Sequence, residues 1–247
     1  MADIQRIKAI IAYDGSAYHG FQRQTTDLPT VTSDIEEALH SLHIYNNIVG
    51  SGRTDAGVHA TGQVIHFDIP GYWSDLKRLT SCLNSKLTHI HFKHITPVDS
   101  AFHARFWAKK RLYRYLFKTV KPSVFEQKYV SYYPPFNPHI LTKALECFRG
   151  RHDFAMFRKT GSPTNTTIRK IYKVHYRKRG AYHVIYFEAN GFLRAQVRMM
   201  VEAAMLCAQS SLTLKQLREQ LQGEVKHSTH LAPSEGLYLA KVIYETA

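Results

Sequence analysis

Hydrophobic residues recur with two different periods along this 247-residue chain, and the two periods predict strands and helices in alternation. Apolar and polar residues alternate over residues 109–120, where Tyr113, Tyr115 and Phe117 share one face, as in a half-buried strand. Apolar residues at three- and four-residue spacing over residues 192–210 predict an amphipathic helix. By the same criteria we expect strands at residues 6–15, 45–52, 62–70, 89–98, 109–120, 168–191 (two strands with a turn at Arg179 and Gly180) and 236–244, and helices at residues 30–42, 73–87, 138–148, 192–210 and 214–222.

The expected elements fall into two comparable halves, with a break near Ala104. Because each half mixes strands and helices, the order of elements predicts an α+β fold. We expect two similar subdomains, residues 1–104 and residues 105–247, each an antiparallel or mixed β-sheet with helices packed on one face. We expect the two sheets to join around a central basic cleft.

The charge of the chain is strongly unbalanced. Thirty-three Lys and Arg residues against nineteen Asp and Glu give a formal net charge of +14 and a pI of about 9.7. Such an excess indicates an anionic partner, and nucleic acid is the commonest one for a basic soluble chain. Basic and aromatic residues are interleaved in residues 106–115, 153–160 and 172–180, which is typical of a broad contact surface for a folded RNA.

The cysteines and the N-terminus bear on where the protein works. Cys82, Cys147 and Cys207 are few, widely separated and without a C-x-x-C pair, so they indicate neither a disulfide scaffold nor a cysteine zinc site. The first residues have no apolar core long enough for a signal peptide, and no segment approaches a membrane-spanning run. We therefore expect a cytoplasmic protein that does not associate with membranes.

One glycine-rich stretch, SGRTDAGVHATGQ at residues 51–63, carries an acidic side chain in this basic chain. Asp55 there has three possible roles: a turn residue, a metal ligand or a catalyst. A carboxylate that faces polyanionic RNA is disfavoured unless the chemistry requires it, and aspartate can act as a nucleophile or a general base. The combination with a basic partner favours catalysis.

Histidines cluster in THIHFKH, residues 88–94, but the pattern does not favour zinc. On a strand His89 and His91 share a face that His94 does not, and no carboxylate or cysteine completes a ligand set. We expect no metal site here. For His59, in the glycine-rich stretch, we expect a role in loop structure.

Residues 50–68, GSGRTDAGVHATGQVIHFD, closely resemble the signature of the tRNA pseudouridine synthase A (TruA) family. Further segments resemble that family in the same order along the chain: IAYDGSAYHGFQRQ (residues 11–24), FHARFWAKKRLYRYLF (102–117), GRHDFAMFRK (150–159), NGFLRAQVRMM (190–200) and LAPSEGLYLAKVIY (231–244). Since these matches cover almost the whole chain, the resemblance is specific.

The resemblance implies roles for five residues. Asp55 corresponds to the catalytic aspartate, and Arg53 to an arginine that helps to hold a flipped-out nucleotide. Tyr113 corresponds to the tyrosine that stacks on the target base, and Arg198 to the arginine that pairs with the aspartate. Leu237 would add an apolar wall to the pocket. Without the resemblance, Tyr113 would be taken for a core aromatic residue and Arg198 for a surface helix residue.

The implied activity is that of an isomerase, a tRNA pseudouridine(38–40) synthase that converts uridine to pseudouridine in the anticodon stem-loop. The nucleotide must leave its stack, at a cost of a few kcal/mol, and a stacked aromatic ring recovers roughly 1–3 kcal/mol. Uracil stays bound while it rotates, so the site needs no hydrolytic water, no metal and no cofactor. Whether Asp55 attacks the sugar, attacks the base or removes a proton stays open.

Two alternatives to this implied activity remain. Residues 194–196 depart from the family's pattern and Thr32 stands where glutamine is common, so the chain could be a paralogue acting on another RNA site. It could also be a non-catalytic RNA-binding module, although a binder has no reason to keep Asp55, Tyr113 and Arg198 together. By resemblance we expect tRNA as the partner and a homodimer as the working form.

Overall fold

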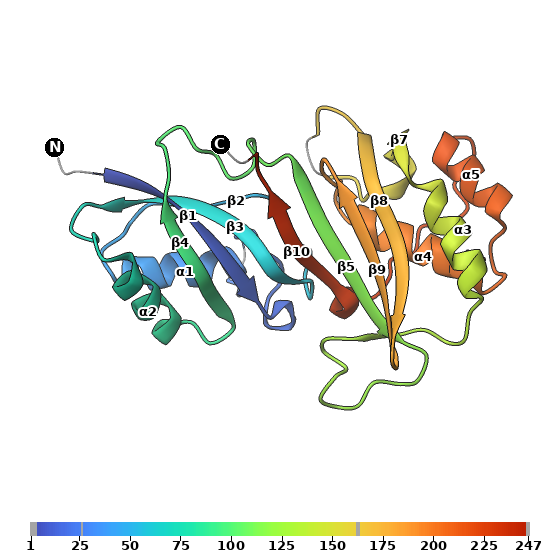
Figure 1. Cartoon of the computed structure of the whole chain (residues 1–247), viewed down its shortest axis with the longest axis horizontal. Helices are drawn as coiled ribbons and strands as arrows, with labels where there is room; N and C mark the ends of the chain where they lie inside the picture. The colour runs from blue at the N-terminus through green and yellow to red at the C-terminus, as the bar shows by residue number, and fades with distance from the viewer. Residues whose placement is uncertain (1–3, 26, 162–163, 246–247) are drawn as a thin grey trace. The chain divides into compact units, whose positions relative to one another are not determined.

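The computed structural model describes residues 4–25, 27–161 and 164–245. Within them the chain forms five α-helices and ten strands, which confirms the predicted α+β class (Figure 1). The chain divides into two compact units, Met1–Lys109 with Leu239–Ala247, and Lys110–Tyr238. The predicted subdomains, their similarity and the central basic cleft stay predictions.

The first unit is built on a sheet with the strand order β4-β1-β3-β10, in which β2 also pairs with β3. β1 pairs antiparallel with both β3 and β4, and alternate residues of β1, Ile7, Ala9 and Ile11, are completely buried. Apolar alternation therefore fixes which face of the sheet meets the core. The strands are β1 (Ile4–Tyr13), β2 (Val49–Gly50), β3 (His59–Pro70), β4 (Ile90–Pro97) and β10 (Leu237–Ile243).

Two helices of the first unit begin at side-chain caps. Thr30 Oγ1 accepts the N–H of Ser33 (3.1 Å) and Ser33 Oγ accepts the N–H of Thr30 (3.0 Å), so a capping box opens α1 (Val31–His40). Asp75 accepts the N–H of Arg78 (2.9 Å) at the start of α2 (Leu76–Lys86). Both caps satisfy backbone donors that the first helical turn leaves unpaired.

The second unit has the strand order β5-β9-β8-β7, with β6 beside β5. Antiparallel pairing joins β9 to β5 and to β8, and the buried residues of β5 and β9, such as Tyr115, Phe117, Ile185 and Phe187, form the core. Helix α3 contacts both α4 and β8. The elements are β5 (Lys110–Lys118), β6 (Ser131–Tyr132), α3 (Pro138–Cys147), β7 (Gly150–Asp153), β8 (Ile168–Arg179), β9 (Tyr182–Ala189), α4 (Gln196–Ala208) and α5 (Leu214–Gln222).

Some predicted bounds were wrong for local reasons. The strand expected at residues 45–52 is only Val49–Gly50, and the short strands β6 and β7 were not predicted. Helix α4 begins at Gln196, not at residue 192, because Ala195 takes a left-handed conformation with φ of 60°. A left-handed residue cannot continue a right-handed helix, so residues 192–194 precede α4 and do not form its first turn.

Candidate active site

Asp55 lies in the first unit, in the connection between β2 and β3. Its side chain is half-buried, whereas that of the neighbouring Arg53 is exposed. The carbonyl of Asp55 accepts the N–H of Val58 (3.2 Å), which closes a turn directly before β3. The carboxylate therefore sits on a tight turn at the beginning of a long, buried strand.

Gln63 of β3 binds the first residues of the connection between β2 and β3. Its side chain is completely buried, with Oε1 accepting from Ser51 Oγ (2.7 Å) and Nε2 donating to the carbonyl of Gly52 (2.8 Å). The N–H of Ser51 also donates to the carbonyl of Val64 (2.8 Å). These bonds explain why a glutamine follows the glycine of the motif.

Residues 13–21, which are the last residue of β1 and the segment after it, contact the other side of the turn, and we call them the clasp. Tyr13 Oη lies 2.9 Å from Thr54 Oγ1, and the N–H of Phe21 donates to the carbonyl of Thr54 (3.1 Å). The N–H of Gly57 donates to the carbonyl of Tyr18 (3.3 Å). Sequence reasoning matched this segment to the family but gave it no role, because the motif does not reveal which residues contact the turn.

Tyr113 lies on β5 in the second unit, opposite Phe187 on β9. It is 8% exposed, and its ring meets the ring of Phe192 edge-on, with centroids 5.2 Å apart. An edge-to-face contact of this kind helps to fix the orientation of the Tyr113 ring. Phe192 was not predicted to have this role, although it lies in a matched segment.

Arg198 lies in the first turns of α4 and is bound to the segment before β10. Its Nε donates to the carbonyl of Ala232 (2.6 Å), and the N–H of Ala232 donates to the carbonyl of Arg198 (3.2 Å). This reciprocal pair fixes the base of the arginine side chain. Leu237, five residues further along, is 5% exposed at the start of β10.

Two further arginines of the second unit bond to backbone carbonyls. Arg111 Nη1 donates to the carbonyl of Asn190 (3.0 Å), and Arg169 Nη1 donates to the carbonyls of Thr166 (2.9 Å) and Ile168 (2.7 Å). Burial, and then the charge of Arg111, lower the pKa of Arg169.

The five predicted site residues are therefore distributed over both units. Asp55 and Arg53 belong to the first unit, and Tyr113, Arg198 and Leu237 belong to the second. Within the second unit, three matched segments come together through the Tyr113–Phe192 and Arg198–Ala232 contacts. The roles of all five residues stay predictions.

One face of β5, β9 and β8 in the second unit is basic and aromatic, and we call it the outer face. Directly opposed residues on these strands share a face: Arg114, Tyr186 and His175 form one row. His175 stacks on Tyr186 with ring centroids 4.7 Å apart. The cations of the outer face include Lys110, Arg114, Lys118, Lys173, Arg177 and Arg179.

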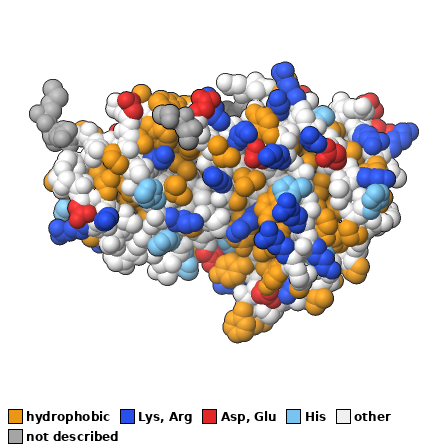
Figure 2. Space-filling view, viewed as in Figure 1, with side chains coloured by type: hydrophobic (Ala, Val, Ile, Leu, Met, Phe, Trp, Pro, Cys, Tyr) orange, Lys and Arg blue, Asp and Glu red, His pale blue; other side chains and the backbone are white. Residues whose placement is uncertain are grey.

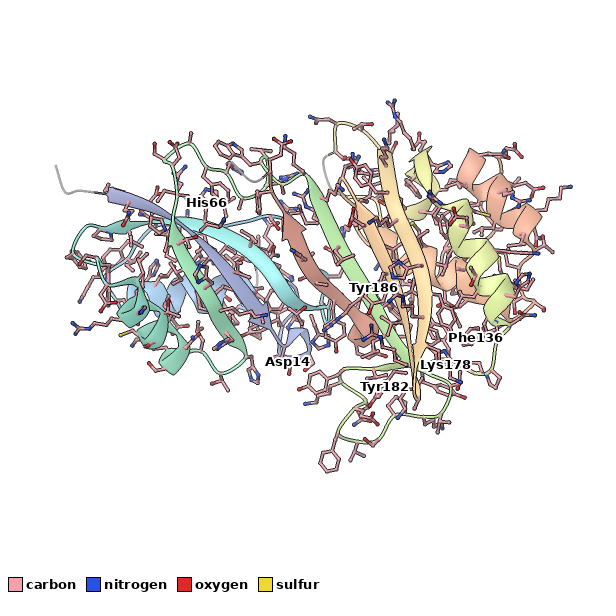
Figure 3. All side chains as sticks on the ribbon, viewed as in Figure 1. Asp14, His66, Phe136, Lys178, Tyr182 and Tyr186 are labelled. Atoms are coloured by element: carbon pink, nitrogen blue, oxygen red, sulfur yellow. The ribbon has the colours of Figure 1, made fainter. Side chains whose placement is uncertain are left out.

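Few acids balance these cations. Glu188, on β9, accepts from Lys110 (3.1 Å), and Glu126 accepts from Lys118 (3.2 Å). Figure 2 shows Lys, Arg and His side chains gathered over these strands, and Figure 3 labels Tyr186 among them. Two of the basic and aromatic segments identified in the sequence, residues 106–115 and 172–180, contribute β5 and β8 to this face.

Residues 4–25, 27–161 and 164–245 contain neither a metal-binding cluster nor a membrane-spanning helix. No group of three or more His, Cys, Asp or Glu among them could hold a metal ion. His89 packs edge-on against Tyr18, with ring centroids 6.3 Å apart. In the same part of the chain, no helix is both long and apolar enough to cross a membrane.

Comparison with known proteins places these features in context. The profile of a family described as tRNA pseudouridine synthase matches residues 9–107 and 144–245. tRNA pseudouridine synthase A of Helicobacter hepaticus is 41% identical over 244 residues, covering 96% of this chain and 98% of the relative. The proteins of that name from Wolinella succinogenes and Lactococcus lactis subsp. cremoris are each 36% identical, over 97% of this chain and 94% and 97% of the relatives.

A solved structure titled "Crystal Structure of a Cbf5-Nop10-Gar1 Complex" is similar with a TM-score of 0.37 and 10% identity, over 81% of this chain and 44% of that one. The sequence matches confirm the resemblance that the motifs indicated.

Proposed function

The chain belongs to the tRNA pseudouridine synthase family, and from this premise we propose that it converts uridine to pseudouridine in tRNA. The observation that carries the proposal is Asp55, a half-buried carboxylate on an anchored turn in a chain with a net charge of +14. A basic RNA-binding chain gains nothing in affinity from such a group, so its place in the family signature favours a catalytic role.

The reaction breaks the glycosidic bond to N1 of uracil and forms a bond from the same sugar carbon to C5. C5 loses a proton and N1 gains one, so the atoms balance without an oxidant or a hydrolytic water. Asp55 supplies the carboxylate for this exchange. Tyr113 stacks on the extruded base, and Arg53 contacts its nucleotide.

Two other residues complete the proposed site. Arg198 pairs with the Asp55 carboxylate and orients it, because a guanidinium presents donors in a geometry that matches both carboxylate oxygens. Its reciprocal bonds with Ala232 support this role, since they hold the arginine at a defined place on α4. Leu237 supplies apolar wall.

We place the target at positions 38–40 of the tRNA anticodon stem-loop. The outer face supports tRNA as the partner, because its cations and interleaved rings suit a phosphate backbone and bases. The free thiols of Cys82, Cys147 and Cys207 are consistent with a reducing compartment, and we propose the cytoplasm.

We propose a homodimer as the working form. A protruding segment after β5 supports it: Val120, Val124 and Phe125 are 71%, 71% and 85% exposed. Large apolar side chains clustered on one exposed segment are typical of a surface that another protein covers.

The activity is tested with purified protein and an unmodified tRNA transcript, by measuring pseudouridine formation and tRNA affinity. The wild type should form pseudouridine, and Asp55→Asn should form none while its tRNA affinity stays within about threefold, since only the reacting carboxylate is lost. Asp27→Asn removes one negative charge from an exposed position in the same unit and serves as the control. Turnover by Asp55→Asn at the rate of Asp27→Asn would contradict the proposal.

A further inference from the structure

His59 connects the strand that follows the Asp55 turn to the clasp. It is the first residue of β3, and its side chain is 2% exposed. Nδ1 accepts the N–H of Gly15 (3.0 Å), and Asp14 Oδ1 lies 3.4 Å from the same nitrogen. Figure 3 labels Asp14, next to this contact at the end of β1.

The direction of this bond defines the state of the histidine. Because the backbone N–H of Gly15 can only donate, Nδ1 carries a lone pair and the neutral ring has its proton on Nε2. Asp14 Oδ1 accepts the N–H of Ser16 (3.0 Å), so the carboxylate also orders the short 3-10 turn Gly15–Ala17. Asp14 in the clasp and His59 in β3 therefore both help to fix the position of the Gly15 backbone.

The backbone of Gly15 approaches the backbone of Val58 and His59 unusually closely. A Cβ atom on Gly15 would lie 2.1 Å from the carbonyl oxygen of Val58 and 2.9 Å from the nitrogen of His59. Only glycine permits this distance, because any side chain would push the two backbones apart. Movement of the clasp is thus transmitted directly to the last residues of the Asp55 turn.

The bond also closes a set of contacts around Asp55. The clasp meets Thr54 before the aspartate through Tyr13 and Phe21, and it meets Gly57 and His59 after it. A further bond of the turn runs from Val58 N–H to the carbonyl of Asp55 itself. Releasing His59 would remove one contact between the later half of the turn and the clasp, where the bond from Gly57 to Tyr18 (3.3 Å) would remain.

We propose that His59 is a positioning residue, which sets the place of the Asp55 carboxylate by accepting the Gly15 N–H. This inference rests on the proposed catalytic role of Asp55. Its consequence is kinetic: a displacement of the reacting group by about 1 Å can cost on the order of 10²-fold in rate, whereas substrate affinity, set over a wide surface, need not change.

β3 offers a matched control in His66, seven residues further along. His66 is 5% exposed, and its Nδ1 accepts the N–H of Ala104 (3.1 Å), so it has the same kind of burial and the same kind of bond. It lies within the same unit, but its partner is not the clasp. His59→Leu and His66→Leu thus remove equivalent interactions, and only the first touches the Asp55 turn.

The test compares kcat, tRNA affinity and the midpoint of urea unfolding for both leucine variants. We expect both to unfold at lower urea, His66→Leu to keep kcat within about threefold, and His59→Leu to lose kcat on the order of 10²-fold with tRNA affinity nearly unchanged. Equal losses of kcat in the two variants would overturn the proposal, because the effect would then be one of general stability.

A second pair of variants, His59→Asn and His59→Gln, tests the proposal even if His59→Leu does not fold. His59→Asn places an acceptor oxygen near the position of Nδ1, whereas His59→Gln places it further out, near that of Nε2. We expect kcat within about fivefold of wild type for asparagine and a loss on the order of 10²-fold for glutamine. Equal kcat values for the two would overturn the acceptor role.

Asp55→Asn separates this inference from the proposed function. If that variant is active, the catalytic role of Asp55 fails, whatever His59 does. If it is inactive while His59→Leu and His66→Leu behave alike, only the positioning role fails.

Discussion

Buried histidines of β3 serve as hydrogen-bond acceptors, and this requires them to be neutral. His66 receives the Ala104 N–H on Nδ1 and packs against the ring of His103, with centroids 4.9 Å apart. Burial first, and then the charges of Arg6 and His103, lower the pKa of His66 to about 4. The folded protein therefore disfavours protonation of His66.

This shift predicts how stability depends on pH. The unfolded chain binds a proton at this histidine below about pH 6.5, and the folded chain does so only below about 4. The contribution of His66 to stability is thus full above pH 6.5 and falls by about 3 kcal/mol as the pH is lowered to 4.

Urea unfolding at a series of pH values checks this prediction. His66→Asn, which keeps an acceptor but does not titrate, should lose this part of the pH dependence. Parallel curves for wild type and His66→Asn between pH 6.5 and 4 would show that His66 is not responsible.

Tyr113 is expected to act through its ring, not through its hydroxyl. Tyr113→Phe keeps the stacking surface and the contact with Phe192, so we expect tRNA affinity within about threefold of wild type. Tyr113→Ala loses the stacking surface, which is worth roughly 1–3 kcal/mol, or about 5- to 150-fold in affinity. Filter-binding measurements with both variants test this, and equal affinities for phenylalanine and alanine would refute the stacking role.

At the level of elements, β3 depends on a close approach to β10. A Cβ atom on Gly62 would lie 2.4 Å from the carbonyl oxygen of Ala240. The obstructing atom belongs to the backbone, so rotation of a side chain cannot relieve the clash. Gly62 of the motif is therefore explained by strand packing, separately from the chemistry of Asp55.

Gly62→Ala should lower the free energy of unfolding by about 3 kcal/mol, the upper part of the range for overpacking. Gly180→Ala is the control: Gly180 has φ of +58° but open space around it, so we expect a loss of about 1 kcal/mol from the left-handed conformation alone. Urea unfolding measures both. A smaller loss for Gly62→Ala than for Gly180→Ala would show that β10 can move away from β3.

The elements were largely predictable, because their periodicity and caps are local. The sequence offered Thr30, Thr32 and Ser33 as caps of the helix at residues 30–42, and Thr30 is the one that caps α1. The turn between β8 and β9 lies at Gly180, as the sequence indicated. The start of α4 was not predictable, since nothing in the sequence marks Ala195 as left-handed. The Gly15–His59 bond joins residues 44 positions apart, and no local pattern encodes such a contact.

At the level of the whole molecule, the exposed apolar segment after β5 gives the dimer proposal a test. Phe125 is 85% exposed, and Phe125→Ser should convert the dimer to a monomer of 28.4 kDa with little loss of stability. Tyr72→Ser, at a 65% exposed position in the other unit, should remain dimeric. Light scattering during gel filtration reports both masses, and a dimeric Phe125→Ser protein would exclude this segment as the interface.

The measurement that tests the central claim most directly is a map of pseudouridines in tRNA from cells lacking this chain, complemented with wild type or with Asp55→Asn. We predict pseudouridine at positions 38–40 with the wild type and unmodified uridine there in the deletion and with Asp55→Asn. Full modification of these positions in the deletion strain, or its restoration by Asp55→Asn, would contradict the account.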